Sequence, residues 1–272
     1  FEKEKDVMTG IVQRYSGKNI SIDLGKADAL LTEAEQVKGE VFRPTEHIKV
    51  YILEVKNTPK GPRITVSRTH PELVKRLFEA EVTEIQDGTV EIMSIAREAG
   101  SRTKMAVRTN NPNVDAVGAC VGKNGERVNA IVEELRGEKI DIVNWDENPG
   151  NFIQNALSPA KIVAVFADPD EKTAKVVVPD YQLSLAIGKE GQNARLAARL
   201  TGYKIDIKSE TQAKDAEGFR YEDYMYDEDG DVYYEEDEYE NGEAAEAEET
   251  AEAVDTEAAD ETAEEVTEES NE

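Results

Sequence analysis

The sequence has few of the residues that form disulfides, bind metals or carry out catalysis. Of its 272 residues one is cysteine, Cys120, and two are histidine, His47 and His70. A single cysteine excludes an internal disulfide framework and suits a reducing cytoplasm. The two histidines lie far apart in the chain and give no metal-ligand spacing, so no metal or other cofactor is expected. Cys120 lies in an apolar stretch and is expected to be a small buried residue.

Long apolar runs and targeting signals are also missing. No apolar run approaches the roughly 20 residues of a membrane span, and no signal-peptide pattern occurs. We therefore expect a cytoplasmic protein without a membrane partner. The first residue is Phe1 and not methionine, so we expect the chain to be the later part of a longer protein.

Catalytic and nucleotide-binding motifs are lacking as well. No Gly-x-Ser-x-Gly occurs, and no nucleophile–base pair can be nominated. The stretch GACVGKN is one residue short of a Walker A loop and has Asn124 where serine or threonine would bind magnesium. No Gly-x-Gly-x-x-Gly follows a strand-like run. The sequence therefore favours a binding protein over an enzyme.

Positive charge is almost absent from the C-terminal part of the chain. From residue 215 to 272 there are 27 acidic residues and one basic residue, a net charge of −26 out of the total of −27. The preceding 214 residues therefore carry a net charge of −1, which leaves room for locally basic surfaces. Residues 212–272 are rich in Glu, Ala and Thr, and we expect a disordered acidic tail.

One stretch of this tail differs from the rest, because residues 219–240 mix tyrosines with carboxylates. A solvated linker is one interpretation of this stretch. A short docking segment, or an internal mimic of nucleic acid that lies on basic faces, is the other.

Residues 7–69 contain five short β-rich runs separated by turn signals such as Ser16-Gly17-Lys18. Five strands in about 60 residues, with few helix signals, predict a small closed barrel. An OB-type fold is the economical choice, because it buries a core without leaving long strand edges. We place this all-β domain at residues 1–69.

A duplicated unit follows the predicted barrel. A helix is expected to begin at His70-Pro71, with proline in its first turn. Residues 70–146 then have the order α-β-β-α-α-β, and residues 147–211 repeat it. The tetrapeptide KIDI recurs at residues 139–142 and 204–207. A repeat of this length is a stronger signal than any single motif, so we expect two homologous α/β domains.

Each copy places a Gly-Lys-x-Gly turn directly in front of a helix. One such turn alone favours a plain helix–turn–helix connection, but two aligned copies favour a phosphate-binding loop. Glycine lets a phosphate approach the main chain, and the following helix offers N–H groups and a positive dipole end. In a KH domain this loop holds the backbone of about four nucleotides of single-stranded RNA. The candidate RNA-binding residues are Gly122, Lys123, Asn124, Gly125 and Arg127 in the first copy, and Gly188, Lys189, Glu190, Gly191, Gln192, Asn193 and Arg195 in the second.

Further basic residues precede the first turn, and aromatic residues occur in the barrel. Arg97, Arg102, Lys104 and Arg108 are either charges on a solvated sheet edge or contacts to phosphates. In the barrel, Tyr15, Phe42 and Tyr51 are candidates for stacking on bases, although Tyr51 could instead belong to the core.

The ordered set of motifs resembles the bacterial NusA family. It includes SRTHPELVKRLFEAEVTEI, IAREAGSRTKMAV, VDAVGACVGKNGERVNAIVEELRGEKIDIV and LAIGKEGQNARLAARLTG, and it covers roughly residues 6–210. The resemblance implies an S1-type barrel and two type II KH domains, without the family's N-terminal polymerase-binding domain. It implies a monomeric transcription factor that binds RNA polymerase, nascent single-stranded RNA and other elongation or antitermination factors. Pausing, intrinsic termination and antitermination would be the processes that it regulates.

Two other functions remain open at the level of sequence. The chain could be the RNA-binding appendage of an exoribonuclease, which would require a catalytic domain upstream. It could also be a ribosome-associated or chaperone-like RNA-binding protein.

Overall fold

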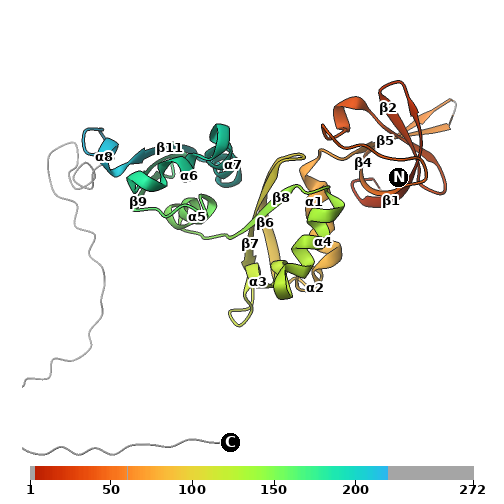
Figure 1. The fold of residues 1–272 in the computed structure, drawn as a ribbon. Coiled ribbons are helices and arrows are strands. Elements are labelled where there is room, and N and C mark those ends of the chain that lie inside the picture. Colours follow the sequence, from red (N-terminus) through yellow and green to blue (C-terminus); the bar gives the residue numbers. More distant parts are fainter. Residues whose placement is uncertain (1–3, 60, 220–272) are drawn as a thin grey trace, which may run out of the picture. The chain divides into compact units, whose positions relative to one another are not determined.

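A computed structural model describes residues 4–59 and 61–219 (Figure 1). The five predicted strands close into a barrel in the order β1-β2-β3-β5-β4, in which β3 pairs parallel with β5 and the other described pairs are antiparallel. Register shifts in β1 and β4 are bulges, which help a small sheet to curve and close. The strands are β1 (Val7–Ser16), β2 (Asn19–Asp23), β3 (Asp28–Leu31), β4 (His47–Thr58) and β5 (Gly61–Ser67), with a 3₁₀ turn η1 (Glu33–Glu35) after β3.

The first repeat has the predicted α-β-β-α-α-β order. Its sheet runs β6-β7-β8, with β6 antiparallel and β8 parallel to β7. Pro71 occupies the first turn of the opening helix, and His70 caps it by accepting a hydrogen bond from the Glu72 backbone N–H. The elements are α1 (Pro71–Glu81), α2 (Thr83–Gln86), β6 (Val90–Glu98), β7 (Arg102–Thr109), α3 (Ala116–Val121), η2 (Lys123–Gly125), α4 (Glu126–Glu134) and β8 (Lys139–Asn144).

The second repeat has no counterpart of the short helix α2, but otherwise it has the same order of α-helices and strands and the same sheet connectivity. β9 is antiparallel and β11 parallel to the central strand β10. Asn148 caps the opening helix, again with proline in its first turn. The predicted duplication is therefore confirmed. The elements are α5 (Pro149–Ala156), β9 (Ala164–Asp168), β10 (Thr173–Val178), η3 (Asp180–Gln182), α6 (Leu183–Ile187), η4 (Lys189–Gly191), α7 (Gln192–Thr201) and β11 (Lys204–Ser209).

The chain remains ordered past residue 212, where we expected the tail to begin. A short helix, α8 (Glu210–Ala213), starts with a capping box formed by Ser209 and Gln212. Phe219 is buried against Val177 of β10, and the ammonium of Lys208 lies 4.2 Å from its ring centre. The expectation of disorder is thus wrong for residues 212–219, because Phe219 covers an apolar part of the sheet. The rest of the predicted tail lies outside the described residues.

The barrel and the first repeat share an apolar core. Tyr51 of β4 packs with Leu73 and Phe78 of α1, and its ring stacks on His70 at 4.8 Å between centres. Phe42 is also buried, inside the barrel. Neither ring is available to stack on a base. The stacking prediction is therefore wrong for Phe42, and for Tyr51 the alternative of a core position is confirmed. Tyr15 is 46% exposed, and its hydroxyl donates to the backbone carbonyl of Phe42.

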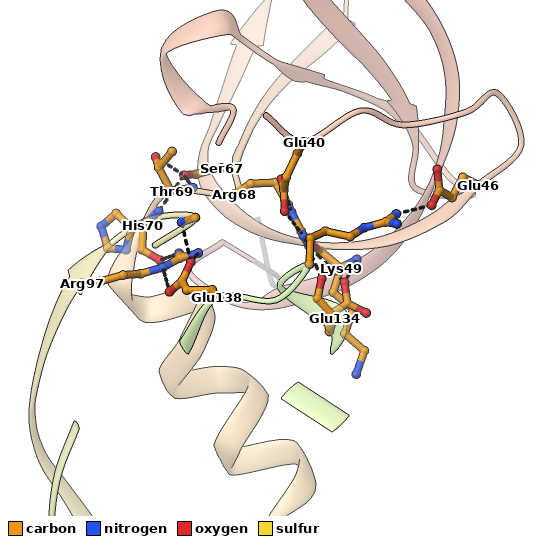
Figure 2. A network of polar contacts seen from close by, with 12 residues as sticks. Glu40, Glu46, Lys49, Ser67, Arg68, Thr69, His70, Arg97, Glu134 and Glu138 are labelled. Atoms are coloured by element: carbon orange, nitrogen blue, oxygen red, sulfur yellow. Dashed lines mark hydrogen bonds and ion pairs between the residues drawn. The ribbon is translucent and has the colours of Figure 1, made fainter. Parts of the chain in front are cut away.

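Arg68 joins the barrel to the first repeat (Figure 2). Its fully buried guanidinium lies between Glu40 of the barrel and Glu134 of α4, with N–O distances of 2.5 and 3.0 Å. It also donates to the backbone carbonyls of Lys49 and Glu134. Because each nitrogen of the guanidinium has a partner on one side of the joint or the other, this side chain ties the two domains together.

A second buried pair stabilises the first repeat where α1 begins. Arg97 of β6 makes two hydrogen bonds to Glu138 (Figure 2). Glu138 also accepts hydrogen bonds from the Thr103 hydroxyl and the Gly100 backbone N–H. Burial alone would raise the pKa of Glu138. The hydrogen bonds and charge of Arg97, with the other two donors, outweigh burial and hold this pKa below its ordinary value of 4.5.

We predict that Arg68→Ala lowers the free energy of unfolding by about 3–5 kcal/mol, because it leaves Glu40 buried without its guanidinium partner. Denaturant unfolding followed by circular dichroism measures the change. Arg63→Ala is the matched control, since Arg63 lies exposed on β5 and its removal should change stability by about 0.5 kcal/mol or less. Equal losses in the two variants would contradict the assigned role of Arg68.

We predict that Glu138→Gln destabilises the protein most at neutral pH. The folded-state pKa of Glu138 is depressed, so the carboxylate contributes stability above its unfolded-state pKa and loses that contribution as the pH falls through the folded value. The free energies of unfolding of wild type and variant, measured at a series of pH values, should therefore converge as the pH falls below 4.5, the ordinary pKa of glutamate. Glu133→Gln, on an exposed position of α4, controls for the general effect of acid. A difference that is constant across pH would contradict the prediction.

Candidate nucleic-acid interface

The two Gly-Lys-x-Gly turns have the same backbone conformation. In the first, Gly122, Asn124 and Gly125 have φ of 76°, 54° and 79°. The corresponding φ values in the second turn are 77°, 53° and 74° at Gly188, Glu190 and Gly191. Three residues of positive φ out of four reverse the chain between two helices. The two turns therefore share their backbone conformation as well as their residue spacing.

The first glycine of each turn is required by close packing as well as by its φ. A Cβ on Gly122 would lie 2.8 Å from Cγ of Arg127, and one on Gly188 would lie 2.8 Å from the backbone nitrogen of Asn193. The second glycines, Gly125 and Gly191, are required chiefly by their positive φ.

The helices that follow the turns begin without a side-chain cap. Neither α4 nor α7 has a side-chain hydrogen bond at its N-cap glycine. The N–H groups of a first helical turn have no partner inside the helix and carry a partial positive charge. Lys123 and Lys189 are exposed beside them. The N–H groups of Gly125 and Gly191 donate within the turns to the carbonyls of Gly122 and Gly188. Each turn therefore presents one exposed cation beside the positive end of a helix, which suits a phosphate.

The third position separates the two turns chemically. Asn124 tolerates the left-handed conformation well, because asparagine is enriched there. Glu190 has nearly the same φ and is exposed, and its backbone carbonyl accepts a hydrogen bond from Arg195. The first turn therefore lacks the negative charge of Glu190 and has less backbone strain at its third position.

Three of the sequence-based candidates are not accessible to RNA. Arg97 is buried against Glu138. Lys104 has no exposed surface and donates to the carbonyl of Ser158 in the second repeat. Asn193 is 6% exposed and donates to two backbone carbonyls. These predictions are wrong because alternation along a strand or helix does not reveal which polar side chain a neighbouring element covers.

Lys104 belongs instead to the joint between the two repeats. Its ammonium also lies 3.3 Å from Asp141, which pairs more closely with Arg102 at 2.6 Å. Burial lowers the pKa of Lys104, and the charge of Asp141 opposes the shift. Arg102 keeps only part of its side chain in solvent.

The other basic candidates are partly exposed and already paired. Arg127 donates to Glu84 and to the carbonyl of Ala119, so it supports the first turn from behind. Arg108 pairs with Glu91 and lies over the ring of Trp145. To contact a phosphate, each of these arginines must either keep its carboxylate partner or give it up in exchange for the phosphate.

Glu98 of β6 contacts the helix that follows the second turn, and sequence reasoning did not identify it. It accepts hydrogen bonds from Gln192 and Arg195 at the start of α7, and Arg199 lies 3.8 Å from it. The bonds from Arg195 lower its pKa from the ordinary value. This carboxylate of the first repeat thereby holds the helix that carries the second turn. Only its position in space reveals the contact, since the partners lie more than 90 residues apart in the chain.

A groove of about 660 Å³ lies where the two repeats meet. The first repeat contributes Asp115, which is the N-cap of α3, together with Val117 of α3 and residues 142–144 of β8. The second contributes Asn155 and Lys161, among others. We call this feature the junction groove. Its amide and carbonyl groups are suited to polar contacts with bases.

Cys120 is buried, as expected, and burial raises the pKa of its thiol to about 12, which makes a thiolate nucleophile unfavourable. Residues 4–59 and 61–219 contain no cluster of three His, Cys, Asp or Glu side chains that could hold a metal ion. Within the same residues, no helix is both long enough and apolar enough to cross a membrane.

We predict opposite stability changes for exchanges at the third turn position. Glu190→Asn should raise the free energy of unfolding by about 1 kcal/mol, because a left-handed φ costs glutamate more than asparagine. Asn124→Glu should lower it by a similar amount, so each repeat serves as the control for the other. Denaturant titrations of both variants measure the effect. Changes of the same sign would contradict the argument from backbone strain.

Both repeated units match known protein families. One family model, a NusA-like first KH domain, matches residues 68–145, and another, a NusA-like second KH domain, matches residues 149–215. Several curated relatives are named transcription termination/antitermination protein NusA. The relative from Bacillus subtilis is 62% identical over 215 residues, which are 79% of this chain and 58% of that protein.

More distant bacteria have relatives with the same name. The Mycobacterium bovis protein is 49% identical over 76% of this chain and 62% of its own length. The Thermus thermophilus protein is 47% identical over 76% of this chain and 54% of its own length. The chain thus spans little more than half the length of these relatives. Its two repeated α/β units are KH domains, and the chain belongs to the NusA family.

Proposed function

We propose that the protein is an RNA-binding transcription elongation factor and not an enzyme. It associates with RNA polymerase and regulates pausing, intrinsic termination and antitermination by holding nascent single-stranded RNA. The observation that carries the proposal is the duplicated glycine turn, which has closely similar φ values in both copies and stands before uncapped helices. The names of the relatives support the transcriptional role.

The residues that contact RNA in this proposal are those that stay accessible at the turns. Gly122, Lys123, Asn124 and Gly125 bind one stretch of backbone, and residues 188–191 bind the next. Gln192 and Arg195 lie beside the second turn and donate hydrogen bonds to Glu98. In this proposal they divide their hydrogen bonds between Glu98 and the phosphate. Arg102, Arg108 and Arg127 contribute positive charge at longer range. The acidic partners around them limit non-specific binding, because they reduce the net positive field.

We propose domain limits of 1–69 for an S1-type OB barrel, and 70–146 and 147–211 for two type II KH domains, with residues 212–219 packed on the second KH domain. The closed five-stranded barrel supports the first assignment. The order α-β-β-α-α-β supports the type II assignment. The protein acts as a cytoplasmic monomer, and other elongation or antitermination factors are its further partners.

The test is a titration of fluorescein-labelled single-stranded RNA, followed by anisotropy. Two double variants, Lys123→Asp with Asn124→Asp and Lys189→Asp with Glu190→Asp, should each weaken binding. The slope of log affinity against log salt should become shallower by about 0.7 for every phosphate that the protein no longer neutralises. Thermal melts should show both variants folded, because all four side chains are exposed. The second variant should melt slightly higher than the wild type, since aspartate tolerates the left-handed φ at position 190 better than glutamate.

Lys214→Asp is the control for the second pair. It changes the net charge by the same amount at an exposed position after α8. Affinity and salt slope should stay at wild-type values in this variant. If the turn variants and Lys214→Asp weaken binding equally, the effect is one of net charge and the assignment of the turns is wrong.

A further inference from the structure

Tyr181 leaves an aromatic ring in solvent near the second turn. It lies in η3, directly before α6, and is 77% exposed. Leu185, one helical turn later, is 45% exposed. The offset of four residues places the two side chains on the same face of the helical segment. Neighbouring apolar side chains that stay exposed mark a contact surface more often than isolated ones do.

Comparison of the two repeats indicates that Tyr181 does not serve the helix. The offset of 66 residues that aligns the glycine turns places Tyr181 on Asp115. Asp115 caps α3 by accepting a hydrogen bond from the Val117 backbone N–H at 3.1 Å. In the second repeat α6 has no side-chain cap. The first repeat thus has a helix-capping carboxylate at this position, whereas the second repeat has a large aromatic ring that does not cap α6.

A hydrogen bond connects the residue next to Tyr181 to the junction groove. Asp115, the counterpart of Tyr181, lines the junction groove. Lys161 lines this groove from the second repeat, and its backbone N–H donates to Gln182 Oε1 at 3.3 Å. One wall of the groove is therefore bonded to the residue next to Tyr181. From there α6 leads in five residues to Gly188.

The side chains at this position have the chemistry of a single-strand platform. Aromatic rings stack on nucleobases of any identity, and nearby cations neutralise the phosphates. Tyr181 provides the ring, and Lys161 provides an exposed ammonium. The carboxylates of Glu190 and Asp180 are also exposed in this region and offset the positive charge of Lys161. Because the net charge is then not strongly positive, stacking contributes a larger part of the binding.

We propose that Tyr181 is a base-stacking residue, which holds one nucleobase of the RNA strand between the junction groove and the second glycine turn. Leu185 extends the apolar surface under the base, and Lys161 contacts the adjoining phosphate. The inference rests on the proposed function, which concerns the RNA backbone at the turns. It adds a contact to a base outside them, which the family's Gly-x-x-Gly loop does not supply.

The experiment compares Tyr181→Ala, Tyr181→Phe and Val41→Ala in the full chain. Single-stranded RNA long enough to reach both turns should bind Tyr181→Ala at least about fivefold more weakly, the lower end of the measured range for stacking. Tyr181→Phe should stay within about twofold of wild type, because the ring is kept. Val41, equally exposed at 77% but on the barrel, should be replaceable without loss.

A second readout locates the stacked base. RNAs with 2-aminopurine at successive positions should include one whose fluorescence is quenched by the wild type and not by Tyr181→Ala. The salt slope should stay at the wild-type value in Tyr181→Ala. It should become shallower by about 0.7 in Lys161→Ala, because that variant no longer neutralises one phosphate.

The outcomes separate this inference from the proposed function. If the wild type binds no RNA, or the turn variants bind as well as wild type, the proposed function fails. If the turn variants lose binding while Tyr181→Ala keeps wild-type affinity and quenching, the stacking role alone is overturned. A loss in Tyr181→Phe equal to that in Tyr181→Ala would also overturn it, since the hydroxyl and not the ring would then make the contact.

Discussion

Buried cations in this protein must find carboxylate or carbonyl partners, and this constraint determines how its domains join. Arg68 connects the barrel to α4 through Glu40 and Glu134. Lys104 connects β7 to the carbonyl of Ser158 in the second repeat. Each side chain is fully buried. If the domains moved apart before water reached the buried cation, its charge would be left without a partner. The joints are therefore specific in their geometry, and they hold the two glycine turns on one folded unit.

The same constraint divides the basic residues into two groups. Arg68, Arg97 and Lys104 are buried and structural, whereas Lys123 and Lys189 are exposed at the turns. The exposed lysines have flexible stems and act as point charges, which suits binding to a phosphate backbone of variable course. The buried arginines use their planar forks, because a fixed joint benefits from several directional hydrogen bonds. Glu98 links the two groups, since it holds Gln192 and Arg195 beside the second turn.

Much of the fold could be predicted from local signals. The alternation of the five β-rich runs indicated the barrel, and the repeat indicated two units of equal topology. Proline in the first turn of α1 and glycine at each turn are local requirements of backbone conformation, and these predictions were confirmed. The error at residue 212 has a different origin. Composition indicated a polar tail, but one residue, Phe219, is enough to hold the chain against Val177 and Lys208.

The candidate site was predictable only in part. The sequence by itself determined the positions of both turns, because positive φ and close packing against the next helix require glycine at the same spacing twice. It also determined the absence of ligand spacings for a histidine- or cysteine-based metal site. Only the tertiary structure decided which charges remain accessible. Asn193, Arg97 and Lys104 resemble surface residues in the sequence, yet each is covered by an element distant in the chain. Burial of a polar group depends on partners that chain topology brings together, and local patterning along one strand or helix does not contain that information.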